Sequence, residues 1–327
     1  MKKIISILVA SVMLIAVFAF VGCEKAEAKL KLGVGTVVST KTSDATEDTN
    51  GQGQATVTIA AVLVDDEGKI VKAFIDCADS TVGHTVDGKA IASKSFATKY
   101  ELGDNYGMKS PYGSSKEWYE HVDAFCTLIV GKTAKEVKAL VAADYKGTEE
   151  VINAGCTIYV AEFAAAVEKA INSATASEAT ASDTLKLGVY TAQTATDATE
   201  DKDGSNKVET TVYAAAVGAN GKVTAAMSDT VEVTFTFDTN GKSTFDPSKA
   251  TLTSKREQGD SYGMKSPYGS EREWYEHANA FDAATVGKTA TEIAALMGND
   301  GKGTADVQAA GCTIYVSAFV KAAEKIK

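Results

Sequence analysis

Histidine is scarce in this sequence, and paired cysteine motifs are missing. The 327 residues include three His and five Cys, with no Cys-x-x-Cys and no Gly-x-Ser-x-Gly. A copper centre usually needs two His, or a Cys together with His. Haem attachment and iron–sulfur clusters need closely spaced cysteines, and a hydrolase triad of this kind needs the serine motif. We therefore expect no metal site and no catalytic triad.

An excess of basic residues is also lacking. Lys and Arg number 33 against 43 Asp and Glu, which gives a formal net charge of −10. Such a surface repels phosphate backbones, so nucleic acid is excluded as a partner. The composition, 45% hydrophobic and 23% charged, is that of an ordinary globular protein, and the length suits two domains.

The N-terminus has the pattern of an export signal. Lys2 and Lys3 precede a stretch from Ile4 to Val21 without charge, which ends at Gly22-Cys23. An apolar run of this length just suffices for a membrane-spanning helix. The short charged start and the Gly-Cys ending instead favour a lipoprotein signal peptide at residues 1–22. We expect a lipid anchor at Cys23 and a location on the extracellular face of the cell membrane.

The rest of the chain consists of two copies of one sequence unit. Residues 103–121 match residues 259–277 at sixteen of nineteen positions, and residues 154–160 return unchanged as 310–316. An offset of 155 to 156 residues indicates tandem domains rather than a solenoid. We expect two homologous domains at 30–172 and 185–327, joined by a flexible Ser-, Thr- and Ala-rich linker at 173–184.

Each copy reads as strands followed by helices. Residues 57–64 and 69–75 flank a turn and predict a β-hairpin. Ser114-x-x-Glu117 predicts a capped helix, and Thr133-x-x-Glu136 predicts a second one. Further helices are expected at 160–171 and 316–326. The fold class is therefore α+β, with an antiparallel sheet followed by helices in each domain.

The repeated 103–121 segment is the first candidate binding site. Together with its copy at 259–277, it contains both Trp, two of the three Pro and two of the three His of the chain. An aromatic loop that opens a capped helix suits a flat ligand, although the Trp could equally belong to the core. The candidate side chains are Tyr106, Met108, Lys109, Tyr112 and Trp118, with their counterparts Tyr262, Met264, Lys265, Tyr268 and Trp274.

The repeated Ala-Gly-Cys-Thr segment is the second candidate. Gly155-Cys156-Thr157 and Gly311-Cys312-Thr313 each precede a predicted terminal helix. On its own, the Thr reads as a turn or capping residue and the Cys as a small buried residue. The pattern resembles the FMN-binding domain in which a flavin transferase attaches FMN covalently to a Thr. It departs from that motif in having Val151 and Val307 at the usual Asp position.

The whole arrangement is similar to the PplA-type extracellular electron-transfer lipoproteins of Gram-positive bacteria. The resemblance rests on the Gly-Cys ending at residue 23, the Tyr-Gly-Met-Lys and Glu-Trp-Tyr-Glu segments, Val-Gly-Lys-Thr, and the Gly-Cys-Thr-Ile segment before the last helix of each copy. It implies two FMN groups linked covalently to Thr157 and Thr313. It also implies an electron carrier, rather than a classical enzyme, between the membrane quinone pool and extracellular acceptors. Two sites in series would allow electrons to pass from one to the other.

A different class of function fits the same residues. A non-redox surface lipoprotein could use the two aromatic loops as binding modules for one ligand, and avidity would explain the duplication. A bound flavin, visible as yellow colour, would distinguish the two functions.

Overall fold

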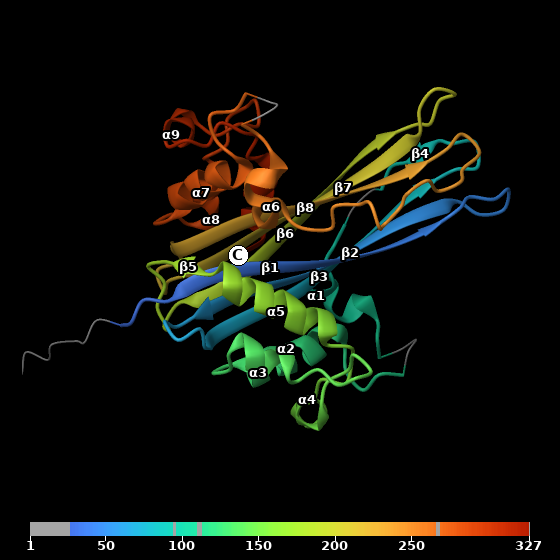
Figure 1. The fold of residues 1–327 in the computed structure, drawn as a ribbon. Coiled ribbons are helices and arrows are strands. Elements are labelled where there is room, and N and C mark those ends of the chain that lie inside the picture. The colour runs from blue at the N-terminus through green and yellow to red at the C-terminus, as the bar shows by residue number, and fades with distance from the viewer. Residues whose placement is uncertain (1–26, 94–95, 110–112, 266–268, 327) are drawn as a thin grey trace, which may run out of the picture.

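The computed structural model describes residues 27–93, 96–109, 113–265 and 269–326. It shows an α+β protein in which each of two antiparallel sheets is followed by helices, as the sequence predicts (Figure 1). The two halves share this order of elements.

The first half contains a five-stranded sheet of order β4-β3-β2-β1-β5. Its strands are β1 (Lys31–Ser43), β2 (Gly51–Val64), β3 (Ile70–His84), β4 (Ala90–Ile91) and β5 (Thr175–Ala176). Its helices are α1 (Lys99–Leu102), the 3₁₀ turn η1 (Gly103–Tyr106), α2 (Trp118–Ile129), α3 (Ala134–Lys138), α4 (Glu149–Ala154) and α5 (Ala161–Ser173).

The second half repeats the plan with a three-stranded sheet of order β6-β7-β8. Its strands are β6 (Thr184–Thr196), β7 (Gly204–Val217) and β8 (Val223–Phe237). Its helices are α6 (Lys255–Gln258), η2 (Gly259–Tyr262), α7 (Trp274–Thr285), α8 (Ala290–Ala294), α9 (Ala305–Ala309), α10 (Ser317–Ala323) and η3 (Glu324–Ile326).

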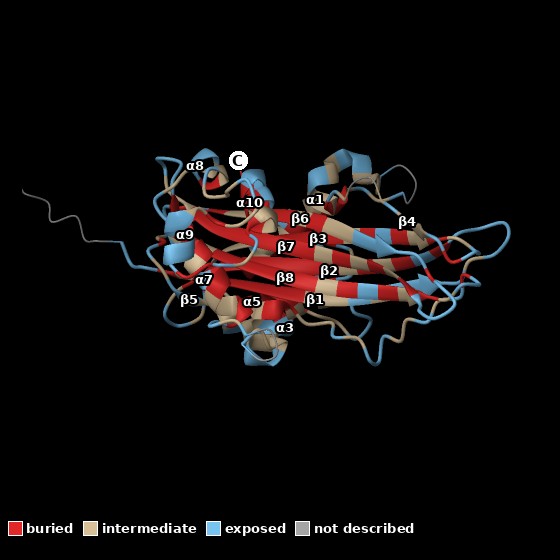
Figure 2. Cartoon of the chain, turned by 90° about the horizontal axis from the view of Figure 1, so that it is seen from above, coloured by how far each residue is buried: buried red, intermediate tan, exposed pale blue. Residues whose placement is uncertain are grey.

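The two sheets pack face to face and share one apolar core. Alternate residues of β2, among them Ile59 and Leu63, point into this core, where they join Val212 and Ala214 of β7. Strand β1 lies against β8, and β3 lies against β6. Figure 2 shows the result as central strands that are buried over most of their length and become exposed toward the far hairpins.

Each sheet covers its outer face with its own helices. The intervening residues of β2, such as Val62, pack under Phe125 of α2 and Val167 of α5. In the second half Tyr213 packs in the same way under Phe281. Both faces of the central strands are therefore buried, and the molecule has four layers, with helices outside and sheets inside (Figure 1).

Two glycines explain why the Leu-Gly-Val triplet recurs. A Cβ atom at Gly33 would lie 1.9 Å from the carbonyl oxygen of Ala170 in α5. A Cβ atom at Gly188 would lie 2.0 Å from the carbonyl oxygen of Ala322 in α10. Only glycine allows the last helix of each half to approach its strand this closely.

The stretch expected to be a flexible linker is packed. Residues 175–176 form β5 on the edge of the first sheet, and Ala179 is fully buried. The backbone N–H of Leu30 donates to the carbonyl oxygen of Ala179 at 2.8 Å. The composition of the stretch indicated flexibility, but small residues also allow a chain to lie flat against a sheet.

The helix after the repeated loop starts later than Ser114-x-x-Glu117 predicts. Helix α2 begins at Trp118 with Glu117 as its N-cap, and Glu120 completes the capping box. Ser114 instead donates to the carbonyl oxygen of Lys116 at 2.7 Å. The box predicted at Thr133 and Glu136 is confirmed. So is the helix expected at 160–171, which the structure places at Ala161–Ser173.

Candidate functional site

A buried histidine joins the two repeated segments in each half. His121, on α2, is fully buried. Its Nδ1 lies 3.2 Å from the carbonyl oxygen of Gly155 and 3.3 Å from the backbone nitrogen of Thr157. Its Nε2 lies 3.2 Å from Oγ of Ser114, at the end of the aromatic loop. The segments that the sequence singles out separately are therefore one site.

The second half repeats this arrangement. Nδ1 of His277 lies 2.8 Å from the carbonyl oxygen of Gly311, and Nε2 lies 3.1 Å from Oγ of Ser270. The ring of each His therefore connects the serine at the end of the aromatic loop to the backbone of the Thr turn. Burial lowers the pKa of His121, which favours the neutral ring in the first half.

The threonine hydroxyls lie at the surface while their neighbours are buried. Thr157 and Thr313 are exposed. Cys156 and Cys312 are fully buried, and burial raises the pKa of each thiol to about 11. These thiols face the core and stay protonated at neutral pH, as expected of small buried residues. The turn therefore exposes the Thr residue to solvent and keeps the Cys thiol buried.

A positively charged side chain, Lys116 or Arg272, packs against the glycine that precedes each cysteine. Gly155 and Gly311 have φ angles of +102° and +111°, which favour glycine. A Cβ atom at Gly155 would lie 2.3 Å from Nζ of Lys116, and one at Gly311 would lie 2.5 Å from the guanidinium carbon of Arg272. Nζ of Lys116 donates to the carbonyl oxygen of Gly155 at 3.0 Å. Both halves therefore hold a positive group beside the Thr turn.

A buried glutamate fixes the aromatic loop. Glu117 accepts hydrogen bonds from the backbone nitrogens of Met108 at 2.7 Å and Lys109 at 3.2 Å. Glu273 does the same for Met264 and Lys265. The sequence indicated this glutamate only as a capping residue. Its second role follows from where the loop folds back, which local patterns do not encode.

A largely buried cation beside this loop, Lys99 of α1, is not indicated by the sequence patterns. Nζ of Lys99 lies 5.2 Å from the ring centre of Tyr106 and 5.7 Å from that of Trp118. It also pairs with Asp79 at 3.2 Å. Burial opposes its charge, but the surrounding negative groups outweigh this and raise the pKa of Lys99.

Lys255 repeats this position between Tyr262 and Trp274, at 5.1 and 5.7 Å from the two ring centres. It pairs with Glu232 at 3.1 Å. The same 156-residue offset that marks the known repeats relates Lys99 to Lys255. That offset is the signal that would have found the pair.

The two lysines of the repeated loop, Lys109 and Lys265, are paired with glutamates at the surface. Nζ of Lys109 lies 2.6 Å from Glu120, and Nζ of Lys265 lies 2.7 Å from Glu276. Trp118 is 4% exposed and packs edge-on against Phe163, and Trp274 packs in the same way on Phe319. Both Trp are thus core residues of the site. Tyr112, Tyr268 and Cys23 lie outside the described residues.

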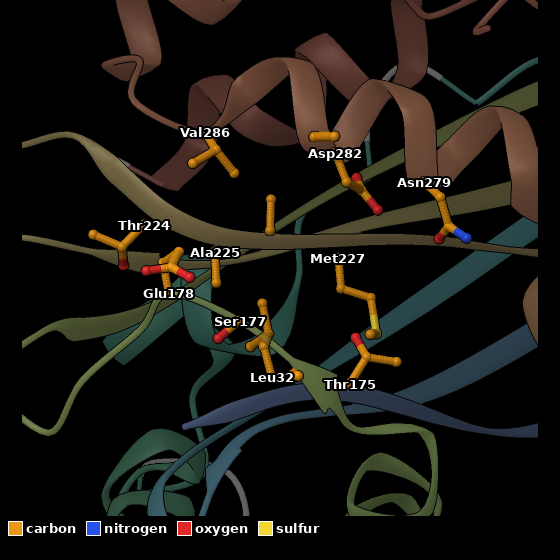
Figure 3. Close-up of a pocket in the computed structure, with 13 residues that line it drawn as sticks. Leu32, Thr175, Ser177, Glu178, Thr224, Ala225, Met227, Asn279, Asp282 and Val286 are labelled. Atoms are coloured by element: carbon orange, nitrogen blue, oxygen red, sulfur yellow. The ribbon is translucent and has the colours of Figure 1, made fainter. Parts of the chain in front are cut away.

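Other features of the described residues lie apart from this site. A cavity of about 410 Å³ opens between the halves, lined by Leu32 and Met227 among others (Figure 3). It includes no residue of the repeated loops or Thr turns. In the part of the chain that the structure describes, no three His, Cys, Asp or Glu side chains converge as metal ligands would. No helix within that part is long and apolar enough to cross a bilayer.

Comparison with known proteins gives one partial match. No family model and no solved structure matches the chain. The chain is 34% identical over 124 residues to a chlorophenol reductase of Desulfitobacterium hafniense. The match covers 34% of this chain and 37% of the reductase, so it spans well under half of that relative.

Proposed function

We propose that the protein is a lipid-anchored extracellular flavoprotein of the PplA type that carries electrons through two FMN groups. In this proposal Cys23 holds the anchor, and the FMN phosphates are joined to Thr157 and Thr313. The electrons come from a quinone-linked donor in the membrane and go to extracellular acceptors. The partial similarity to a reductase supports a redox role.

The observation that carries the proposal is an exposed Thr with a Lys or Arg side chain packed beside its turn. The same arrangement occurs in both halves. Lys116 and Arg272 lie over Gly155 and Gly311, two residues before each Thr. A Lys or Arg group at this place suits a phosphate diester, whose remaining charge is negative. The residues present therefore fit an FMN phosphate.

Attachment would follow from the exposure of the hydroxyl. With a flavin dinucleotide as donor, the Thr oxygen forms the new bond to the FMN phosphorus. The pyrophosphate bond breaks, AMP leaves, and the hydroxyl proton is released. The turn contributes geometry, because His121 contacts the backbone at Gly155 and at Thr157, just before the side chain that carries the hydroxyl. The acid–base chemistry belongs to the transferase.

Bound FMN would supply reversible uptake of electrons and protons. The protein would position the flavin ring and adjust its reduction potential through nearby charges. The backbone of Met108 and the ring of Tyr106 line the loop beside the site, and Lys99 provides a buried positive charge that favours the reduced, anionic form.

Intact-mass measurement on protein from a flavinylating host tests the proposal. Wild type should carry two FMN phosphate adducts, Thr157→Val and Thr313→Val one each, and the double variant none. Thr127→Val removes another exposed hydroxyl from the first half and should keep both adducts. A colourless wild type without adducts would favour a non-redox ligand-binding lipoprotein. Separately, Cys23→Ser should abolish detergent partitioning of the exported protein, which tests the anchor.

A further inference from the structure

The two candidate sites lie on opposite outer faces of the molecule. Thr157 lies between α4 and α5, in the helix layer below the first sheet in Figure 1. Thr313 lies between α9 and α10, in the helix layer above the second sheet. The two inner sheets separate them. The two sheets pack about 10 Å apart, and each helix layer lies about 10 Å outside its own sheet. The two sites are therefore on the order of 30 Å from each other.

The core that separates the two sheets is largely aliphatic. The core between the sheets consists mainly of Val, Leu, Ile and Ala, with Met227 and a few Phe, and its described members include no Tyr or Trp. Electron transfer through protein slows exponentially with distance, and this core offers no easily oxidised side chain as a stepping stone. Direct transfer across it is therefore slow.

Symmetric contacts hold the sites in these positions. Lys169 of α5 pairs with Glu257 of α6 at 2.9 Å, and the equivalent Lys325 pairs with Glu101 at 2.7 Å. At the far hairpins the backbone nitrogen of Ala45 donates to Gly241, and that of the equivalent Ala198 donates to Gly88. Each contact from the first half to the second has an equivalent contact from the second half to the first, as a pseudo-twofold axis requires.

The direction of this axis determines where the two sites lie relative to the strands. Strands β1 and β6 both run toward the end where these hairpins meet, so the axis runs along the strands. It relates the two sites by rotation without shifting them along the strands. They lie at the same level of the molecule, on opposite sides.

We infer that the two sites work in parallel and not in series. Each exchanges electrons with partners at its own face, and electrons do not pass between them inside one chain. This rests on the proposed function, and it replaces the expectation of transfer from one site to the other. A membrane hydroquinone that loses two electrons and two protons leaves both electrons and one proton at one site, and the second proton goes to water.

A distance measurement tests the geometry without any flavin. Nitroxide labels on the double variant Thr157→Cys and Thr313→Cys, made in a host without the transferase, report the separation by pulsed electron resonance. The chain without the two new cysteines gives the background labelling, since three of its four described thiols are buried and Cys126 is half-buried. A separation on the order of 30 Å supports the inference, and one below about 20 Å overturns it.

A kinetic measurement tests the consequence. Reduced, flavin-loaded wild type, Thr157→Val and Thr313→Val are mixed rapidly with ferricyanide. Parallel sites predict that each variant keeps the rate constant of its remaining site within about twofold, with half the amplitude. If the rate constant of the remaining site falls more than about tenfold, that site passes its electrons to the acceptor through the other site, and the inference is overturned. A wild type without flavin would refute the proposed function, while the distance result would still stand.

Discussion

At the scale of single residues, the positive charges near each site differ in what surrounds them. Lys109 lies at the surface and pairs with Glu120, where water and salt screen its charge. Lys99 is held between two rings and pairs with Asp79, with its side chain 15% exposed. A charge in such a place acts over a longer range, because the surrounding dielectric is lower.

This difference predicts which lysine tunes the first site. Lys99→Met should lower the reduction potential of the first flavin more than Lys109→Met does, because it removes the less screened charge. A unit charge at about 10 Å in an effective dielectric of about 20 contributes on the order of 1–2 kcal/mol. Spectroelectrochemistry on the full chain carrying Thr313→Val isolates this site.

Lys255→Met provides the control for this prediction. On the Thr313→Val background it should leave the first potential unchanged, since Lys255 belongs to the other half. If Lys109→Met has the larger effect, the flavin lies against the outer part of the loop, away from Tyr106.

At the scale of elements, the closest contact is between a strand and the last helix of its half. Gly33→Ala would place a methyl group 1.9 Å from the carbonyl oxygen of Ala170, so strand and helix must separate. We expect a loss of about 1–3 kcal/mol in unfolding free energy, measured by denaturant titration. Gly83→Ala is the matched control in the same sheet, because its nearest neighbour is the flexible end of Ile91 at 3.3 Å. Equal losses in both variants would contradict this interpretation.

A buried carboxylate links strand β3 to helix α1. Asp76 accepts from the backbone nitrogens of Cys77 and Tyr100, and burial raises its pKa from 3.8 to about 6. The folded state therefore binds this proton more tightly than the unfolded chain does. Keeping the group charged above pH 6 costs up to about 3 kcal/mol, and the cost disappears as the pH falls through 6 toward 4.

Asp76→Asn tests this carboxylate, since the amide keeps an acceptor oxygen and carries no charge. The variant should gain stability relative to wild type at pH 8 and lose that advantage by pH 4. Denaturant titrations at both pH values measure the difference, which cancels the contributions of other groups such as His84. A stability difference that does not change with pH would mean that Asp76 has an ordinary pKa.

How much of these elements the sequence predicts depends on whether the signal is local. The hairpin around residues 65–68 and the capped helix at Thr133 follow from alternation, turn chemistry and capping residues, and the structure confirms both. The start of α2 does not follow, because Ser114-x-x-Glu117 matches the capping-box pattern, whereas Glu117 is not among the preferred N-cap residues. The tertiary bonds from Glu117 to Met108 decide between them.

The candidate site was predictable in its parts but not in its assembly. Repetition points to the aromatic loop, and repetition together with the resemblance to a flavinylated motif points to Thr157. Their meeting at His121 depends on how α2 packs against the turn before α5, a contact between residues 34 positions apart in sequence. Lys116 does not stand out in the sequence, because its counterpart is Arg272 and the repeat preserves the charge but not the residue.

At the scale of the whole molecule, the two halves are parts of one folded unit. The face of β2 that carries Ile59 and Leu63 packs on the face of β7 that carries Val212 and Ala214. Strand residues that are buried on both faces show a continuous apolar run, which does not say what covers each face. The tandem repeat therefore indicated two domains, and it carried no sign that their sheets are packed together.

The last prediction follows from this shared core. Residues 27–183 and 184–326, each produced alone, expose the inner face of a sheet, an apolar surface too large to remain in water. Each half should therefore self-associate or aggregate. The pseudo-twofold arrangement favours a dimer through the same face, with Lys169 of one copy near Glu101 of the other.

Co-expressed halves should instead recover a one-to-one complex, because it restores both the core and the two ion pairs. Sedimentation velocity distinguishes these states, with the full chain as the reference. The co-expressed halves should also keep the flavin potentials of the full chain, since each site is built within one half. Halves that stay monomeric and folded at high concentration would show that the sheet–sheet core is dispensable, and the parallel arrangement of the sites would then lose its structural basis.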